Sequence, residues 1–323
     1  MARSEERSCG APGGCLIEVQ GLCKRYGARV AVDGLSFTVQ EGELFGLLGP
    51  NGAGKTTTMS LLSTLLAPDG GELRLCGLDV AREPARVRAL IGHVPQELAL
   101  YGALDARQNL AFFGRIHGLS GRRLRARVDE LLGAVGLAER AAEPVEGFSG
   151  GMKRRLNLAV SLVHGPRIVF FDEPTVGVDP QSRNFIFELI ERLKADGVTM
   201  IYTTHYMEEA SRLCDRVAIV DQGRLLALDT PRGLVGLLGG GVVHLEAEGV
   251  ESLVEAAASL PMVEDARMEG QRLVVRTRAT DEAARALVAL CHERAVRLTG
   301  LRVLEPNLES VFLHLTGKGL RDA

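Results

Sequence analysis

The sequence lacks several features that would by themselves assign it to a functional class. Its formal net charge is −3, so no excess of basic residues indicates a nucleic-acid-binding surface, and we expect no nucleic-acid partner. No stretch approaches the roughly 18 uninterrupted apolar residues of a membrane-spanning helix. Residues 1–15 mix charged and small residues without an apolar core, which excludes a secretory signal and predicts a disordered leader.

Cysteine is also sparse and scattered. The sequence contains no Cys-x-x-Cys pair, whereas disulfide frameworks and zinc sites need cysteines in closer clusters. We therefore expect reduced thiols, as in a cytoplasmic protein. The six cysteines are Cys9, Cys15, Cys23, Cys76, Cys214 and Cys291.

The chain is long enough for one large domain and a small one, with 323 residues of which 46% are hydrophobic. Over residues 16–230, β-rich runs alternate with helical patterns, which predicts an α/β fold with a parallel or mixed sheet. One of the helices would bury Phe185, Leu189 and Leu193 on a single face. Strands are expected at 43–48, 167–172 and 198–204, helices at 55–66 and 181–197, and a hairpin at 216–229 turning at Gln222 and Gly223.

A second, smaller domain is expected at the C-terminal end. Three consecutive glycines close the segment 231–241, which we interpret as a linker because such a run sustains neither a helix nor a strand. Residues 242–323 then follow a β-α-β-β-α-β pattern that contains no Gly-rich loop and no carboxylate pair. The expected strands are 242–248, 263–269, 272–278 and 296–305, and the expected helices are 251–260, 281–294 and 308–316.

The strongest chemical signal is a phosphate-binding loop. LLGPNGAGKTTT (47–58) contains G-x-x-x-x-G-K-[ST] between a predicted strand and a predicted helix, which is the setting that this pattern requires. Glycines let backbone N–H groups surround phosphate oxygens, Lys55 would reach the β- and γ-phosphates, and the Thr56 hydroxyl would ligate Mg²⁺. The predicted ATP-binding residues of the loop are Gly49, Pro50, Asn51, Gly52, Ala53, Gly54, Lys55, Thr56 and Thr57.

Two carboxylates end the apolar run IVFFDEP (168–174). Asp172 falls at the C-terminal tip of a predicted buried strand, where ligands bind in open α/β sheets, and it is the expected partner of Mg²⁺. Glu173 should point to the other side of the strand end, toward the γ-phosphate. A carboxylate there can orient and deprotonate a water for in-line attack, so Glu173 is the candidate general base.

A second helix start suited to an anion lies in VEGFSGGMKRRL (145–156). Ser149, Gly150 and Gly151 open an apolar-periodic segment, and the free backbone N–H groups and the positive dipole end of a helix converge at such a position. The chain therefore has two predicted phosphate-binding positions (seats), the phosphate loop and this helix start, although one bound ATP needs only the phosphate loop.

The segment FSGGMKRRL resembles the signature motif of ATP-binding cassette (ABC) proteins, and further markers follow in the order of that family over residues 16–230. In detail the chain looks like the ATPase subunits of ABC-2 type exporters, including daunorubicin-type resistance pumps, and its ending, LEPNLESVFLHLTGKGLRD (304–322), is similar to theirs. The matching markers are Tyr26 for the aromatic that stacks on adenine, Gln96 for the Q-loop glutamine, Asp179 for the D-loop aspartate and His205 for the switch histidine.

The resemblance implies a P-loop NTPase of the ABC type, with a mixed-sheet core, a helical subdomain at about 97–165 and a small α+β domain at the C-terminal end. Two copies would pack head to tail, so that each ATP lies between the P-loop of one copy and Ser149, Gly150 and Gly151 of the other. Catalysis would then rest on Glu173, His205 and Gln96, and the Mg²⁺ ligands would be Thr56, Gln96 and Asp172.

The partner implied by the resemblance is a separate transmembrane permease, which would hold the ATPase homodimer at the cytoplasmic face of the cell membrane. Residues 97–109 would contact it, and Asp105 with Gln108 would cap the helix that follows. The transported substrate, whether a drug, a lipid or glycan precursor or an ion, stays open. So does the role of the C-terminal domain, which either gates the ATPase or stabilises the dimer.

Two other functions compete with the exporter. A soluble mechanical ATPase of the DNA-repair type would carry a long coiled coil between the P-loop and Asp172, but this interval is compact and shows no heptads. Translation-type relatives carry two cassettes per chain, and this chain has one. A regulatory ATP sensor that scarcely turns over is disfavoured because Glu173 and His205 are both present. The sequence therefore favours the exporter subunit.

Overall fold

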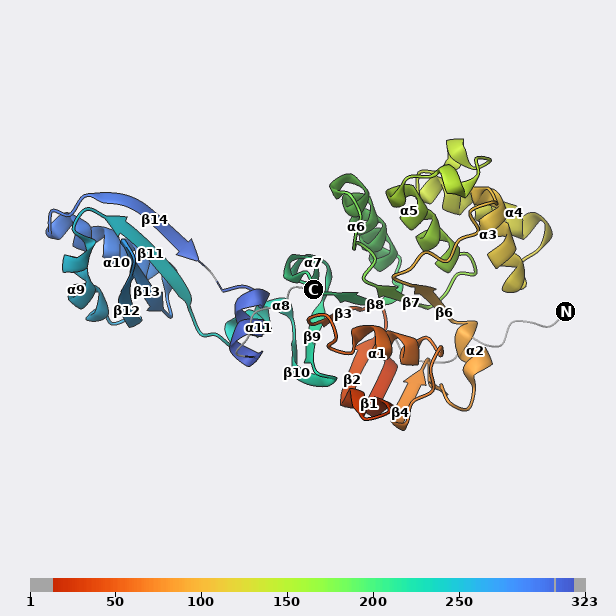
Figure 1. Cartoon of the computed structure of the whole chain (residues 1–323), viewed down its shortest axis with the longest axis horizontal. Helices are drawn as coiled ribbons and strands as arrows, with labels where there is room; N and C mark the ends of the chain where they lie inside the picture. Colours follow the sequence, from red (N-terminus) through yellow and green to blue (C-terminus); the bar gives the residue numbers. More distant parts are fainter. Residues whose placement is uncertain (1–13, 305, 317–323) are drawn as a thin grey trace. The chain divides into compact units, whose positions relative to one another are not determined.

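The computed structural model of this chain describes residues 14–304 and 306–316. These residues form two compact units whose boundary lies between Leu228 and Asp229 (Figure 1). Most of the predicted leader falls outside the described residues, and Cys15 already opens the first strand. No helix within the described ranges combines the length and hydrophobicity needed to cross a bilayer.

The first unit is built around a central sheet in which β3 lies between two parallel neighbours, β8 and β9. The residues of β3, β7 and β8 are all buried, as expected for strands covered on both faces. In spatial order the strands are β10 (Arg224–Asp229), β9 (Arg216–Asp221), β3 (Leu44–Leu48), β8 (Thr199–Thr204), β7 (Ile168–Asp172) and β6 (Ile91–Val94).

The register of this sheet brings the predicted motifs together. Leu48 pairs with Thr204, and Asp172 pairs with Thr203. Since β3, β7 and β8 are parallel, the segments that follow them emerge at one edge of the sheet. The phosphate loop, Glu173 and His205 therefore meet there.

A second, antiparallel sheet packs against the central one. The two sheets and α1 (Lys55–Leu62) share a hydrophobic core, in which the rings of Phe37 and Phe45 stack with centroids 5.0 Å apart. The separate antiparallel sheet was not anticipated from the sequence. Its strands, in spatial order, are β2 (Arg29–Gln40), β1 (Cys15–Tyr26), β4 (Gly70–Leu75) and β5 (Leu78–Asp79).

A helical portion follows β6 and carries the segment with Ser149 (Figure 1). Asp105 accepts from the backbone N–H of Gln108, whose side chain accepts from the N–H of Asp105, so the predicted capping box is confirmed. The helices are α3 (Ala106–Ile116), α4 (Gly121–Ala134), the 3₁₀ turns η1 (Ala138–Arg140) and η2 (Val145–Gly147), and α5 (Gly150–Ser161). The remaining helices of the first unit are α2 (Pro84–Arg88), α6 (Pro180–Ala195) and α7 (Met207–Leu213).

The second unit contains an antiparallel sheet with two helices on one face. Side chains of β11, β13, α9 and α10 share one core, and α11 packs against α8. The sheet order is β12 (Val263–Glu269), β13 (Arg272–Thr277), β11 (Gly241–Ala247) and β14 (Leu298–Leu304). The helices are α8 (Pro231–Gly236), η3 (Val250–Leu253), α9 (Val254–Ala258), α10 (Thr280–Glu293) and α11 (Leu308–Thr316).

Three local predictions differ from the structure. The helix predicted to reach residue 66 ends at Leu62, because Thr64 turns to a φ of 64°. The segment 231–241 is not irregular throughout: Thr230 caps α8 by accepting from the N–H of Gly233. On α6 the buried residues are Ile186, Phe187, Leu189 and Ile190, whereas Phe185 and Leu193 of the predicted apolar face are only partly buried.

Candidate functional site

The phosphate loop joins β3 to α1, and glycine shapes its end. Gly54 precedes α1 with a φ of 101°, and a Cβ there would lie 2.4 Å from the carbonyl oxygen of Ala31. Only glycine fits that position. The first backbone N–H groups of α1 consequently face the loop and are free to contact an anion.

Lys55 lies at the centre of the loop. Its Nζ donates to the carbonyl oxygens of Gly49 at 2.8 Å and Pro50 at 3.0 Å, and lies 3.0 Å from Oε1 of Glu173. Only 4% of Lys55 is exposed. A buried ammonium with these partners is a fixed positive charge at the place where the motif expects phosphate.

An open cleft of about 320 Å³ lies beside the loop, within the size range of small-ligand sites. Tyr26 stands at its rim, 49% exposed, so a ring face is available for stacking. Gly49, Pro50 and Ala53 are buried on the inner side of the loop and do not line the cleft. The lining residues are Tyr26, Arg29, Ala31, Asn51, Gly52, Gly54, Lys55, Thr56, Thr57, Gln96 and Glu173.

Asp172 ends β7 as a buried carboxylate, 3% exposed. The hydroxyl of Thr203 donates to its Oδ1 at 2.8 Å. Burial raises the pKa of Asp172, and the hydrogen bonds from the Thr203 and Thr56 hydroxyls oppose that rise. Thr56 and Asp172 thus place a hydroxyl and a carboxylate side by side, next to the cleft.

These oxygens fit a divalent cation only with help from a ligand. Among residues 14–304 and 306–316, no group of three or more His, Cys, Asp or Glu side chains is placed to hold a metal. Mg²⁺ is usually held by one or two carboxylates together with substrate phosphates rather than by an all-protein cage. The donors near the cleft suit that mode of binding.

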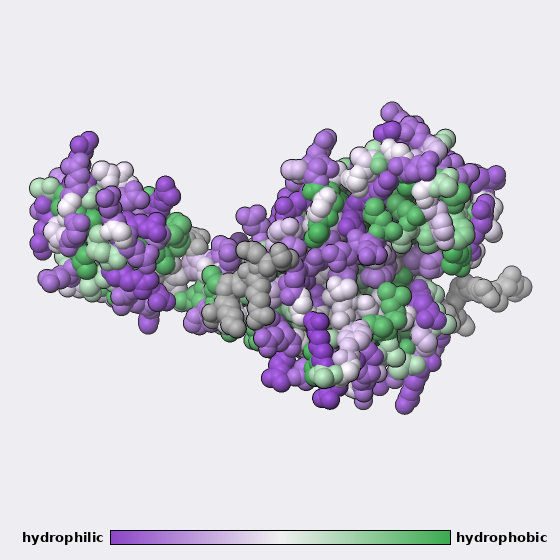
Figure 2. Space-filling model, viewed as in Figure 1, coloured by the Kyte–Doolittle hydropathy of each residue, from purple (hydrophilic) through white to green (hydrophobic). Residues whose placement is uncertain are grey.

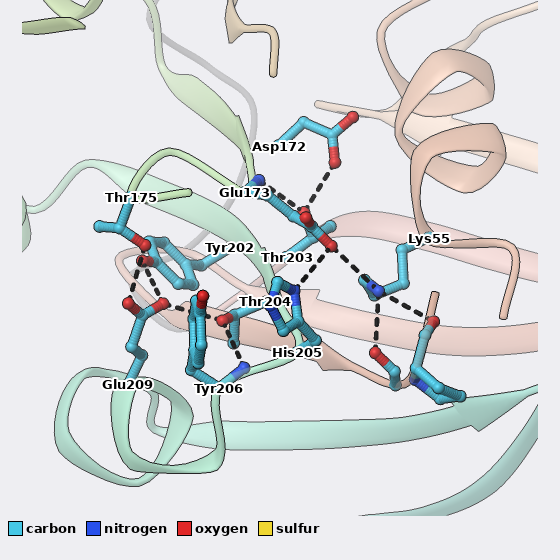
Figure 3. Close-up of polar contacts among 12 residues, drawn as sticks. Lys55, Asp172, Glu173, Thr175, Tyr202, Thr203, Thr204, His205, Tyr206 and Glu209 are labelled. Carbon is cyan, nitrogen blue, oxygen red and sulfur yellow. Dashed lines mark hydrogen bonds and ion pairs between the residues drawn. The ribbon is translucent and has the colours of Figure 1, made fainter. Parts of the chain in front are cut away.

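Glu173 follows Asp172 in an unusual backbone conformation, with a φ of 46° and its N–H donating to the Thr203 hydroxyl at 2.9 Å. Non-glycine residues with positive φ are uncommon and gather at functional sites. Besides Lys55, its Oε1 faces Nδ1 of His205 at 3.4 Å, without the alignment of a hydrogen bond (Figure 3). Glu173 is therefore a buried carboxylate with an ammonium and an imidazole within 3.4 Å of the same oxygen.

Gln96 lines the cleft, and its backbone is tied to the helix that Ser149 caps. Arg154 of α5, 5% exposed, donates to the carbonyl oxygens of Pro95 at 2.9 Å and Gln96 at 2.8 Å. Gln96, on the cleft wall, and α5 are therefore linked directly.

The predicted second anion seat does not line the cleft. Ser149 and Gly150 are exposed at the start of α5, and the Ser149 side chain accepts from the N–H of Met152 at 3.3 Å. A Cβ at Gly151 would lie 2.9 Å from Oδ2 of Asp179, so the predicted seat adjoins the predicted D-loop aspartate. Asp179 caps α6, and its hydrogen bond from the backbone N–H of Ser182 lowers its pKa. Within one chain, the predicted site residues thus form two groups.

Sequence reasoning missed three residues here: Arg29 on the cleft wall, Thr203 between the two carboxylates, and Glu209, a buried acid of α7. No pattern marks them. An acidic residue in the first turn of a helix usually indicates only a favourable interaction with the helix dipole.

The sequence matches a known protein family and individual known proteins. The family model described as ABC transporter matches residues 32–176. The linearmycin resistance ATP-binding protein LnrL of Bacillus subtilis (strain 168) is 44% identical over 311 residues, which cover 95% of this chain and 100% of that protein. The daunorubicin resistance ATP-binding protein DrrA2 of Streptomyces coeruleorubidus is 43% identical over 312 residues, covering 94% of this chain and 96% of that protein.

A solved structure resembles part of this chain. It is the dimeric structure of a post-hydrolysis state of the ATP-binding cassette MJ0796 bound to ADP and Pi, with a TM-score of 0.61 and 25% sequence identity. The match covers 67% of this chain and 98% of that one.

Proposed function

The chain belongs to the ABC transporter family, and on that premise we propose that it is the ATP-hydrolysing subunit of an ABC-2 type membrane exporter. The observation that carries the hydrolytic part is the contact of the Glu173 carboxylate, which lines the P-loop cleft, with both Lys55 and His205. The export part is supported by whole-length similarity to two resistance ATP-binding proteins.

ATP would bind with its adenine on the Tyr26 ring and its phosphates on the backbone N–H groups of residues 51–57, with Lys55 as the counter-charge. Thr56, Asp172 and Gln96 would hold Mg²⁺, which supplies charge neutralisation at the β- and γ-phosphates. These contacts would bring the γ-phosphate near Glu173, whose carboxylate would then face an attacking water.

In hydrolysis Glu173 orients that water and accepts its proton. His205, whose Nδ1 lies next to the same carboxylate oxygen, would contact the γ-phosphate and hold the Glu173 side chain in its orientation. Gln96 completes the water and cation environment. A positioned general base typically contributes about 10²–10⁴ in rate, so loss of Glu173 should be far more harmful to turnover than to ATP binding.

The active form would be a head-to-tail homodimer. Ser149 and Gly150 are exposed at the start of α5, Gly151 is buried next to them, and none of the three lines the cleft of its own chain. A partner copy would bring this seat to the γ-phosphate, and Asp179, next to Gly151, would join the contact. Dimer formation would then depend on ATP and end with loss of γ-phosphate contacts.

A separate transmembrane permease is the second proposed partner, and it would keep the ATPase at the cytoplasmic face of the cell membrane. Exposed apolar residues beyond Gln96 support this docking: Leu98, Tyr101, Phe112 and Ile116. The rings of Tyr101 and Phe112 are in edge contact, with centroids 5.0 Å apart, and Figure 2 shows hydrophobic surface over α3 and α5. Exposed apolar groups of this kind mark interaction sites.

The test is a pull-down from detergent-solubilised membranes with MgATP, using tagged Glu173→Gln as bait and tagged Lys55→Ala as the matched control. We expect a stoichiometric polytopic membrane protein with Glu173→Gln. Recovery of ribosomal or DNA-associated proteins alone would refute export and favour a soluble mechanical ATPase.

A further inference from the structure

A buried carboxylate outside the predicted site connects three of its segments. Glu209 of α7 is 1% exposed, and its two oxygens accept from side chains on different parts of the chain (Figure 3). Oε1 accepts from Thr175 Oγ1 at 2.7 Å and from Arg183 Nε at 2.9 Å. Oε2 accepts from Tyr202 OH and Thr204 Oγ1, each at 2.8 Å.

The donors flank the proposed catalytic groups. Thr175 lies two positions after Glu173, and Arg183 lies in the first turns of α6, which Asp179 caps. Thr204 immediately precedes His205. One carboxylate therefore joins the turn after the general base, the helix after the D-loop and the strand before the switch histidine.

Thr204 extends the link across His205. Its hydroxyl donates to Glu209 and accepts from the backbone N–H of Tyr206 at 2.9 Å, so the backbone is held on both sides of the histidine. The Tyr206 ring lies 4.1 Å from the His205 ring, and the Arg183 guanidinium stacks on Tyr206 at 5.0 Å. The imidazole is thereby fixed through its neighbours and makes no contact with Glu209 itself.

The negative charge of Glu209 is balanced by a cationic partner. Nη2 of Arg183 lies 2.7 Å from Oε1 of Glu209, giving the buried carboxylate a cationic partner as well as three hydroxyl donors. A buried charge with a full set of donors holds them in one arrangement, because any departure leaves a polar group unpaired. Burial, followed by the nearby Glu209 charge, raises the pKa of Tyr202, which keeps that phenol a donor.

From these contacts we infer that Glu209, acting through Thr204, is a positioning residue that holds His205 against Glu173 in the geometry required for hydrolysis. The inference rests on the proposed function. It concerns the rate of the chemical step and not ATP binding, since Glu209 and Thr204 do not line the cleft.

The test uses the purified full-length chain and steady-state MgATP hydrolysis, with rates normalised to nucleotide-binding sites. Thr204→Val keeps the side-chain shape and removes the hydroxyl. We expect kcat to fall about tenfold or more while KM for ATP changes less than about twofold, because a small misplacement of a catalytic group slows chemistry strongly. Thr204→Ser restores the hydroxyl and should recover most of kcat. Glu209→Gln should reproduce the loss of kcat.

The matched control is Thr199→Val on the same strand. Thr199 is also fully buried, and its hydroxyl accepts from the backbone N–H of Gly42 at 2.8 Å, far along β8 from His205. It should lose comparable stability but keep the parental kcat per binding site. Equal kcat in Thr204→Val and Thr199→Val, or failure of Thr204→Ser to recover activity, would overturn the inference.

Glu173→Gln, measured in parallel, separates the two proposals. Parental turnover by Glu173→Gln would defeat the assignment of the general base itself. An inactive Glu173→Gln beside a fully active Thr204→Val would defeat only the role of Glu209.

Discussion

The proposed ATP site is shared between two copies of the chain and is called the composite site below. Two adjacent glycines at the start of α5 allow it to be tested independently of the stability of a single chain. A Cβ at Gly150 would have no described atom within 4 Å apart from its chain neighbours and the backbone of its own helix. A Cβ at Gly151 would lie 2.0 Å from Oγ of Ser182 and 2.7 Å from its Cβ, so rotation of the serine would not relieve the clash. Substitution by alanine should therefore affect the stability of the free protein differently at the two positions.

Gly150→Ala should not destabilise the free protein. Replacing glycine by alanine in a helix stabilises the fold by roughly 0.5–1 kcal/mol, because alanine lowers the conformational entropy of the unfolded chain. For a unit of this size that corresponds to a rise in Tm of about 2–4 °C at most. Hydrolysis should nonetheless collapse, because the added methyl group would occupy the space in which the partner's γ-phosphate approaches the helix N-terminus.

Gly151→Ala should destabilise the free protein by about 1–3 kcal/mol, the usual range for overpacking, by displacing the start of α6 and with it Asp179. Thermal unfolding without nucleotide and MgATP hydrolysis, measured on both variants, supply the comparison. A Gly150→Ala protein with parental stability and parental turnover would refute the approach of a phosphate from outside the chain.

Three further predictions concern the cleft and its surroundings. Glu173→Gln should retain ATP binding and lose about 10²-fold or more in turnover, whereas Lys55→Ala should lose binding as well, as measured by titration with a fluorescent ATP analogue. Arg29→Ala should raise KM for ATP severalfold with kcat unchanged, since its guanidinium lies on the cleft wall, 3.7 Å from where a Cβ of Gly52 would be; Arg25→Ala, outside the cleft, is the control. Burial lowers the pKa of His93 from 6.5 to about 4, so the unfolded chain binds more protons in that window and stability falls as pH drops from 6.5 toward 4. His93→Leu should lose less Tm than the parent between pH 7 and pH 5, and an equal loss would count against this cause.

The sequence was most informative where one local pattern determines the structure. The P-loop needs its glycines, the Asp105–Gln108 capping box is complete within four residues, and Gln222 and Gly223 both adopt the positive φ of a tight hairpin turn. Such features depend on neighbours in the chain and were predicted with their boundaries.

Features that depend on distant partners were missed. Phe185 fits an apolar helix face by periodicity, but the structure places it beneath two guanidinium groups, Arg155 at 4.8 Å and Arg192 at 5.9 Å from its ring. Glu209 is one of two adjacent acids in the first turn of α7, and only the fold shows that donors from three segments converge on it. Residue spacing along the chain predicts neither the guanidinium groups around Phe185 nor the donors around Glu209.

The two-group arrangement of site residues leads to one decisive measurement. In a head-to-tail dimer each site takes its P-loop from one copy and its Ser149 from the other. Lys55→Ala and Ser149→Ala should each hydrolyse little ATP alone. A mixture of the two should form dimers with one intact site, recovering about a quarter of the parental activity at equal concentrations if pairing is random. A mixture no more active than its components, or full activity of Ser149→Ala alone, would contradict the composite site.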